Sequence, residues 1–278
     1  MLTQADKGRL FRALHERDRA FIIPNPWDPG TARLLARLGF EALATTSAGC
    51  AFSLGQRDNT VGRDLMIAHV AAIASATDLP VSADLENGYG DDVEAVADTI
   101  RRATAAGAVG GSIEDATGRG DAPLYELVHA AERIAAAAQI VRSLDVPFTL
   151  TARAENYLVG RPDLADTITR LQAYQAAGAD VLYAPGLTRT DDIATVVRSL
   201  DRPVNVLGGL AGARLSLADL SGLGVRRVSV GSLLSRAAFG AFLRASSEMY
   251  ERGTFSFSDD AVPYKDLSEM FGRATGGS

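Results

Sequence analysis

The 278-residue sequence has one cysteine, Cys50, three histidines and no apolar run near the roughly 18 residues that a membrane-spanning helix needs. A single cysteine excludes an internal disulfide and a cysteine-based metal cluster, and its small-residue surroundings are typical of a buried, inert thiol. The first residues, 1–18, are charged and polar, which is unlike a signal peptide. We therefore expect a cytoplasmic protein without a membrane partner.

An excess of basic residues is also absent. Lys plus Arg number 28 and Asp plus Glu number 34, which gives a formal net charge of −6. Such a balance argues against a nucleic-acid partner, because nucleic-acid-binding surfaces are basic. Hydrophobic residues make up 47%, enough for a full core, so a disordered chain is excluded.

Short β-branched runs alternate with longer amphipathic stretches rich in Ala, Leu and Arg. This alternation is typical of parallel βαβ units, and about eight of them predict a (β/α)8 TIM barrel. A doubly wound sheet is the alternative, but residues 25–30 after the first run lack its Gly-rich nucleotide turn. The eight predicted strands are Ala20–Pro24, Ala42–Thr46, Pro80–Asp84, Gly110–Glu114, Phe148–Arg153, Val181–Ala184, Pro203–Leu207 and Arg226–Val230.

Glycines mark the predicted helix ends, where a left-handed residue closes a helix before the next strand. They are Gly39, Gly107, Gly178 and Gly224. No linker or composition break divides the chain, so we expect one barrel domain over residues 1–278. Two helical stretches, Ser232–Arg252 and Ala261–Phe271, follow the last strand and predict a C-terminal extension from about residue 232.

Acidic side chains collect at the predicted ends of strands three, four and five, where TIM barrels hold their active sites. They are Asp84, Glu86, Glu114, Asp115 and Glu155. Like charges at one barrel mouth repel unless a cation lies between them, and oxygen ligands alone suit Mg²⁺ or Mn²⁺. The alternative is that some of these acids, Asp115 for example, only cap the following helices.

Arg153 ends strand five beside these acids. It could clamp a substrate carboxylate, pair with Glu155 or Glu114, or do both. The histidines, at positions 15, 69 and 129, all fall in predicted helices, which argues against a histidine base or a Ser-His-Asp triad. The sequence therefore favours chemistry that depends on a metal ion and an arginine.

Four motifs occur in order along the chain. They are Ser53-Leu54-Gly55-Gln56-Arg57-Asp58, Ala83-Asp84-Leu85-Glu86-Asn87-Gly88-Tyr89-Gly90, Ser112-Ile113-Glu114-Asp115 and Thr151-Ala152-Arg153-Ala154-Glu155. With this order and spacing the chain resembles the isocitrate lyase/phosphoenolpyruvate mutase superfamily. The resemblance implies a barrel that binds Mg²⁺ and a 2-oxo acid or its enolate, and that makes or breaks a C–C or P–C bond.

The resemblance also implies roles for single residues. Asp84 is then the direct metal ligand, while Asp58, Glu86 and Glu114 hold metal-bound waters, although superfamily members have Asp where Glu86 stands. The catalytic candidates are Arg153, Glu114 and Asp58. The substrate-binding candidates are Thr46, Ser47, Asp84, Arg153, Asn205 at the end of strand seven, and Trp27, which lies near the position that closes the pocket floor.

The loop of residues 115–125 departs from that pattern. It lacks the Lys-Lys-Cys-Gly-His run whose cysteine is the general acid of isocitrate and methylisocitrate lyases, and it lacks the Asn of the phosphonomutases. Its glycines and its position after Glu114 predict a lid. Arg119 within it either contacts a bound anion or is a solvated surface residue. The general base is open among Glu155, Asp115 and Tyr157.

We therefore expect a Mg²⁺-dependent carbon–carbon lyase that acts on a small 2-oxo or 2-hydroxy di- or tricarboxylate, in the manner of an oxaloacetate decarboxylase or a methylisocitrate lyase. The alternatives are P–C chemistry of the phosphonopyruvate hydrolase or mutase type, and a barrel that binds a 2-oxo acid without turnover. The superfamily exchanges its last barrel helix within dimers that pair into tetramers, so we also expect a homo-oligomer with swapped C-terminal helices.

Overall fold

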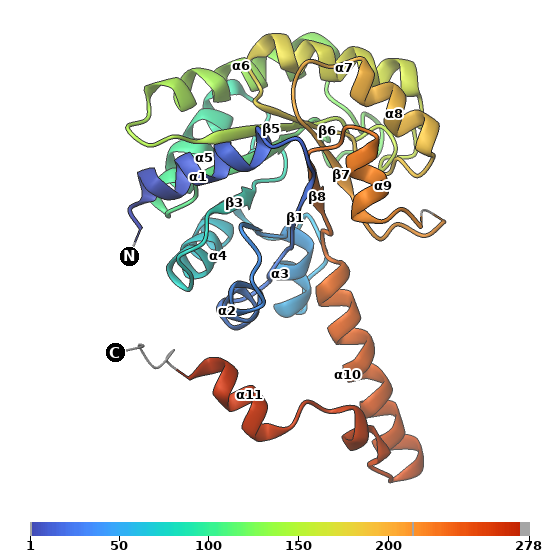
Figure 1. Ribbon diagram of the computed structural model, residues 1–278. Helices are drawn as coiled ribbons and strands as arrows, with labels where there is room; N and C mark the ends of the chain where they lie inside the picture. Colours follow the sequence, from blue (N-terminus) through green and yellow to red (C-terminus); the bar gives the residue numbers. More distant parts are fainter. Residues whose placement is uncertain (1, 213, 273–278) are drawn as a thin grey trace.

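The computed structural model describes residues 2–212 and 214–272, and its centre is a sheet of eight parallel strands (Figure 1). From β2 to β8 each strand pairs with the next strand in sequence, and β1 pairs with β8. The Ala44 N–H donates to the Pro24 carbonyl at 3.1 Å and links β1 to β2. The strands are β1 Phe21–Ile23, β2 Leu43–Ala44, β3 Val81–Asp84, β4 Gly110–Glu114, β5 Thr149–Arg153, β6 Val181–Tyr183, β7 Val204–Leu207 and β8 Arg227–Ser229.

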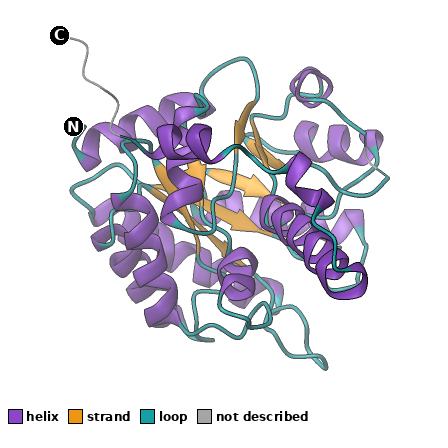
Figure 2. Cartoon of the chain, turned by 90° about the horizontal axis from the view of Figure 1, so that it is seen from below, coloured by secondary structure: helices purple, strands orange, loops and turns teal. Residues whose placement is uncertain are grey.

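This order confirms the predicted (β/α)8 barrel and all eight predicted strands. A doubly wound sheet is wrong, because its first and last strands would not pair. Helices surround the strands, as the view from below shows (Figure 2). They are α2 Pro29–Arg37, α3 Ser47–Ser53, α4 Arg63–Ser75, α5 Val93–Ala105, α6 Leu127–Ser143, α7 Leu164–Ala177, α8 Thr190–Arg198 and α9 Leu217–Gly222.

The four glycines predicted to end helices all have left-handed backbones. Their φ angles are 90° at Gly39, 96° at Gly107, 107° at Gly178 and 88° at Gly224. A side chain would be strained in this conformation, so glycine fixes where each helix turns into the next strand.

An N-terminal helix, α1 (Gln4–His15), precedes the barrel; the sequence placed His15 in a helix but did not give the bounds of that helix. Thr3 and Asp6 form a capping box at its start, which is the sequence signal that could have located it. Phe11 and Leu14 are buried, and the Gln4 side chain donates to the carbonyl oxygens of Thr104 and Ala108 at 2.8 and 2.9 Å. The helix therefore covers the N-terminal side of the barrel, opposite the strand ends that carry the acids.

Two helices lie in the region for which the C-terminal extension was predicted. Helix α10 (Leu233–Arg252) leads away from the barrel, and α11 (Tyr264–Phe271) returns to contact α2 (Figure 1). A 3₁₀ turn, η1 (Ser256–Asp260), occupies the predicted connector. The Glu248 carboxylate fixes this turn, because it accepts from Thr254 Oγ1 and Ser256 Oγ, both at 2.8 Å. No helix in the described part of the chain has the length and apolar character to cross a membrane.

The contact of α1 with the barrel gives a stability prediction. An added Cβ at Gly8 would lie 2.2 Å from the Pro147 carbonyl oxygen, which is backbone and cannot turn away. Gly8→Ala should therefore lower the free energy of unfolding by about 1–3 kcal/mol in urea titrations, although helix propensity alone would raise it. Gly240→Ala in α10 is the control, since it meets only the end of the Arg244 side chain at 3.3 Å. An equal effect of both substitutions would contradict this packing.

Candidate active site

A cavity of about 470 Å³ opens at the C-terminal ends of the barrel strands. This is where the sequence placed the acids. The predicted site residues that line this cavity are Thr46, Ser47, Asp58, Asp84, Glu114, Arg153 and Asn205. The tertiary structure thus brings together seven of the nine candidates.

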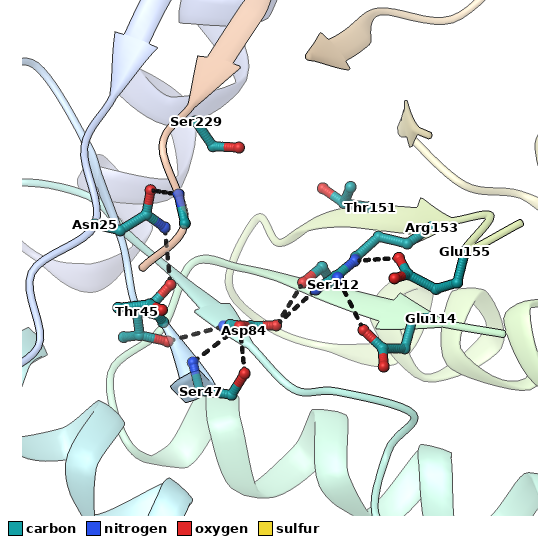
Figure 3. A network of polar contacts seen from close by, with 12 residues as sticks. Asn25, Thr45, Ser47, Asp84, Ser112, Glu114, Thr151, Arg153, Glu155 and Ser229 are labelled. Carbon is teal, nitrogen blue, oxygen red and sulfur yellow. Dashed lines mark hydrogen bonds and ion pairs between the residues drawn. The ribbon is translucent and has the colours of Figure 1, made fainter. Parts of the chain in front are cut away.

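Asp84, the last residue of β3, lies at the centre of the polar network (Figure 3). Its Oδ2 accepts from both the backbone N–H and the hydroxyl of Ser47, at 2.9 Å each. Its Oδ1 accepts from Arg153 Nη1 at 3.0 Å. The backbone N–H of Asp84 donates to Thr45 Oγ1 at 2.8 Å, so both its main chain and its carboxylate are fixed.

Arg153, the last residue of β5, contacts three carboxylates through three different nitrogens (Figure 3). Nε donates to Glu155 Oε1 at 2.8 Å, Nη2 to Glu114 Oε2 at 3.0 Å and Nη1 to Asp84. Burial alone would lower the pKa of Arg153, but these carboxylates outweigh burial and hold it well above its usual value. Of the alternatives that the sequence left open for Arg153, the ion pair with Glu155 or Glu114 is present in the structure, with both carboxylates.

The cluster has more acids than its one arginine can neutralise. Burial, followed by nearby carboxylates, raises the pKa of Asp58 and raises the pKa of Glu86 to about 8. Burial also raises the pKa of Glu114 and Glu155, against the opposing effect of Arg153. A region in which ionisation is so disfavoured would be stabilised by a further cation.

The donor set fits a hard divalent cation. It consists of oxygen atoms only, and the buried Glu86 Oε1 has no hydrogen-bond partner within the described chain. No group of three His, Cys, Asp or Glu side chains in residues 2–212 and 214–272 is placed to hold a metal ion by itself. These residues therefore suit a cation with few direct protein ligands and several waters, which is how Mg²⁺ usually binds.

Two predicted residues lie outside the main cavity. Glu86 lines a neighbouring cavity of about 270 Å³ together with Glu114. It lies two residues after the end of β3, and its backbone is left-handed (φ 48°). Trp27, predicted near the pocket floor, lines neither of these cavities. It is half-buried, and its backbone N–H donates to Thr31 Oγ1 at 3.2 Å.

Thr46 and Asn205 both line the cavity while supporting the backbone around it. The Thr46 hydroxyl caps α3 by accepting from the Gly49 N–H at 3.2 Å. The Asn205 amide donates to Ser229 Oγ at 3.0 Å, and its oxygen accepts from Arg227 Nε at 2.9 Å.

Asp115 does not cap the next helix as the alternative interpretation proposed. It is buried, and its Oδ1 accepts from the Glu155 N–H at 2.8 Å. Its Oδ2 accepts from the Tyr174 hydroxyl at 2.5 Å and from Arg170 Nη1 at 3.1 Å. These bonds occupy both oxygens of Asp115 and position Glu155. Of the three candidate bases, only Glu155 lines the main cavity.

The loop of residues 115–125 folds back on itself beside the site. Ala116 and Leu124 form an antiparallel bridge, and the Thr117 N–H donates to the Pro123 carbonyl at 3.0 Å. Arg119 is exposed and pairs with Asp91 at 2.8 Å, and it lines neither cavity. In this structure Arg119 is thus a surface residue.

Sequence reasoning missed several inward-facing residues of the cavity, namely Thr45, Ser112, Tyr183, Arg227 and Ser229. Their signal was the period of two in a strand, which places Arg227 and Ser229 on the same face of β8. The clearest sign of an inward-facing site residue was Arg227, because it is a charged residue within a predicted core strand.

The chain is similar to several known proteins. The family model of phosphoenolpyruvate phosphomutase matches residues 11–250. A phosphonopyruvate hydrolase of Variovorax sp. (strain Pal2) is 30% identical, over 96% of this chain and 95% of its own. An oxaloacetate decarboxylase of Paraburkholderia xenovorans (strain LB400) is 27% identical, over 99% of this chain and 92% of its own.

Among solved structures, a lyase/mutase homologue from Burkholderia cenocepacia J2315 is 62% identical, with a TM-score of 0.95 over 98% of this chain and 97% of its own. A phosphonopyruvate hydrolase in complex with oxalate and Mg²⁺ is 27% identical, with a TM-score of 0.84 over 95% of this chain and 94% of its own. The motifs, the barrel and these matches agree, and the chain belongs to the phosphoenolpyruvate phosphomutase family of the isocitrate lyase/phosphoenolpyruvate mutase superfamily.

Proposed function

We propose that this protein is a Mg²⁺-dependent carbon–carbon lyase that decarboxylates a small 2-oxo dicarboxylate of the oxaloacetate type. The observation that supports this most directly is the group of Asp84, Glu114 and Glu155 around one arginine at the barrel mouth. The cavity of about 470 Å³ has room for a small acid. An oxaloacetate decarboxylase also aligns with nearly the whole chain.

Asp84 would hold the Mg²⁺ ion directly, with Asp58, Glu86 and Glu114 binding its waters. When bound, the ion supplies positive charge beside the 2-oxo group, where negative charge develops as the bond breaks. Arg153 binds the substrate carboxylate, and Glu155 keeps its guanidinium in place.

Decarboxylation suits the residues present. The bond between the oxo-bearing fragment and the departing carboxylate breaks, its electron pair stays with the fragment as an enolate, and CO₂ leaves without a general acid. Isocitrate-type cleavage instead needs the donor that the loop of residues 115–125 lacks. Loss of a general acid costs about 10²–10⁴-fold in rate, so we expect isocitrate and methylisocitrate to be poor substrates by at least that factor.

Hydrolysis of a phosphonate is the second candidate, because the phosphonopyruvate hydrolase relative is 30% identical over 96% of this chain. It would use the same acids and Arg153 on a P–C bond.

The test is turnover of oxaloacetate, phosphonopyruvate, isocitrate and methylisocitrate with Mg²⁺, followed by mass spectrometry. We expect release of CO₂ from oxaloacetate, and we expect Asp84→Ala to abolish both this turnover and Mg²⁺ binding by calorimetry. Asp98→Ala is the control, because Asp98 pairs with Arg63 and Arg102 on the helical surface.

Unchanged Mg²⁺ affinity in the Asp84→Ala variant would refute the metal assignment. Turnover of phosphonopyruvate alone would establish the second candidate, efficient glyoxylate release from isocitrate would refute the argument from the loop, and tight binding without turnover would identify a non-catalytic barrel.

Arg153→Lys provides a separate prediction. Lysine keeps the charge, but one ammonium cannot reproduce three directed nitrogens that contact three carboxylates. We expect kcat/KM to fall by about 30-fold or more, which corresponds to the lower end of the cost of removing one partner of a buried charge pair, about 2 kcal/mol. Arg119→Lys should keep wild-type kinetics, because Arg119 pairs with Asp91 outside the cavity. Near-normal kinetics of the Arg153→Lys variant would make Arg153 structural only.

We further propose that the chain forms a homo-oligomer by exchanging its C-terminal helices. The extension exposes large apolar side chains that a single chain does not cover. The most exposed are Phe242 (65%), Leu243 (62%), Tyr250 (93%), Phe255 (65%) and Tyr264 (89%).

Sedimentation at micromolar concentration should therefore give an oligomer, and Phe242→Asp should weaken it because burial of a charge opposes association. Val128→Asp is the control, since Val128 is a similarly exposed apolar residue (71%) but lies on α6. A monodisperse wild-type monomer would rule out the exchange.

A further inference from the structure

Arg227, the first residue of β8, is a buried arginine without an acidic partner. Its side chain is almost completely buried, and the three contacts of its guanidinium are all to neutral groups. Nε donates to Asn205 Oδ1 at 2.9 Å, Nη2 donates to Thr151 Oγ1 at 3.0 Å, and Nη1 lies 3.4 Å from His15 Nε2. No Asp or Glu in residues 2–212 and 214–272 pairs with it.

His15 adds no negative charge. Its Nδ1 lies 2.8 Å from the Phe11 carbonyl oxygen and must carry the proton of that hydrogen bond, so Nε2 has the lone pair that faces Arg227. Burial, followed by the charge of Arg227, lowers the pKa of His15 to about 3. The imidazole is therefore neutral, and it accepts from Arg227 without compensating its charge.

An uncompensated buried guanidinium is costly, because burial of a charge needs a partner of opposite sign. Burial lowers the pKa of Arg227 to about 10, so it remains charged at neutral pH. A guanidinium has five N–H groups, and the three contacts leave two of them without an acceptor.

Arg227 also lines the main cavity. Of the described residues around this cavity only Arg153 and Arg227 are cationic, and Arg153 is already surrounded by three carboxylates. On the inward face of β8, Arg227 precedes Ser229 by two residues, so it lies deeper in the barrel than the strand ends. Its Thr151 partner likewise precedes Arg153 on β5 (Figure 3).

We propose that Arg227 is a second anion-binding residue, at the floor of the cavity. When a ligand with two carboxylates is bound, Arg227 binds the carboxylate that lies deeper in the barrel. Arg153 at the mouth is shared with three acids, whereas Arg227 at the floor has no carboxylate partner among the described residues. The substrate would then be a short acid with two anionic groups, one at Arg153 and the mouth and one at Arg227. This identification of the substrate rests on the proposed function, but the binding of a carboxylate at Arg227 does not.

The test measures binding in the absence of metal and turnover. Succinate is titrated against the protein in EDTA, at ionic strength held constant with a bulky buffer anion, and the melting temperature is recorded. The uncharged diamide of succinate serves as the matched probe. We expect succinate, and not its diamide, to raise the melting temperature of the wild-type protein.

Two variants test the residue. In Arg227→Met we expect the half-saturating succinate concentration to rise at least tenfold, while Arg226→Met, which changes the neighbouring arginine outside the cavity, keeps the wild-type value. Asn205→Asp replaces the amide, whose oxygen already accepts from Arg227 Nε, with a carboxylate. This variant should fold, and its carboxylate should compete with succinate for Arg227. The half-saturating succinate concentration should therefore rise by a similar factor. This second variant decides the matter if Arg227→Met does not fold.

Absence of a succinate effect on the wild-type protein would overturn the inference, and so would an unchanged effect in a folded Arg227→Met or Asn205→Asp variant. Because neither metal nor turnover enters the measurement, a positive result would stand even if oxaloacetate is not decarboxylated. Conversely, a lyase whose succinate binding does not depend on Arg227 would keep the proposed function and lose this inference.

Discussion

The Arg153 guanidinium determines the arrangement of the barrel mouth. Three carboxylates from β3, β4 and the segment after β5 all contact it at 2.8–3.0 Å. Without a cation at this point, Asp84, Glu114 and Glu155 would repel one another at close range in a poorly solvated region. Asp115 supports the arrangement from behind, because it binds the Glu155 N–H and is itself fixed by Tyr174 and Arg170. The geometry of the site is therefore set before any ligand enters.

The charge of the cavity is unevenly distributed along the barrel axis. The mouth holds more carboxylates than its one arginine can neutralise, and the interior holds Arg227 among neutral groups. Helix α1 contributes to this separation, since it carries His15 into contact with Arg227 and closes the opposite side with Phe11 and Leu14. An acidic mouth and a cationic floor together favour a divalent cation and an anionic ligand in one cavity.

The C-terminal extension follows a different principle from the barrel. Barrel residues bury their apolar surface against neighbouring strands and helices of the same chain, whereas α10 and α11 expose Phe242, Leu243, Tyr250 and Tyr264. Such a surface is typical of a protein interface. The connector is nevertheless well defined, because Glu248 holds the turn at Ser256 through its backbone and hydroxyl.

The sequence alone determined the architecture, because strand and helix periods, glycine stops such as Gly178 and the acids at strand ends are local signals. It also identified Asp84, Glu114 and Arg153, since the ends of parallel barrel strands necessarily meet at one mouth. It could not show which acids share the arginine, that Asp115 is a buried support, or that Glu86 faces a neighbouring cavity. Nor did it show Arg227 inside the barrel beside His15, two residues 212 positions apart. These contacts join residues far apart in the chain, and only the closure of the barrel, which fixes strand register and the direction of each inward side chain, decided them.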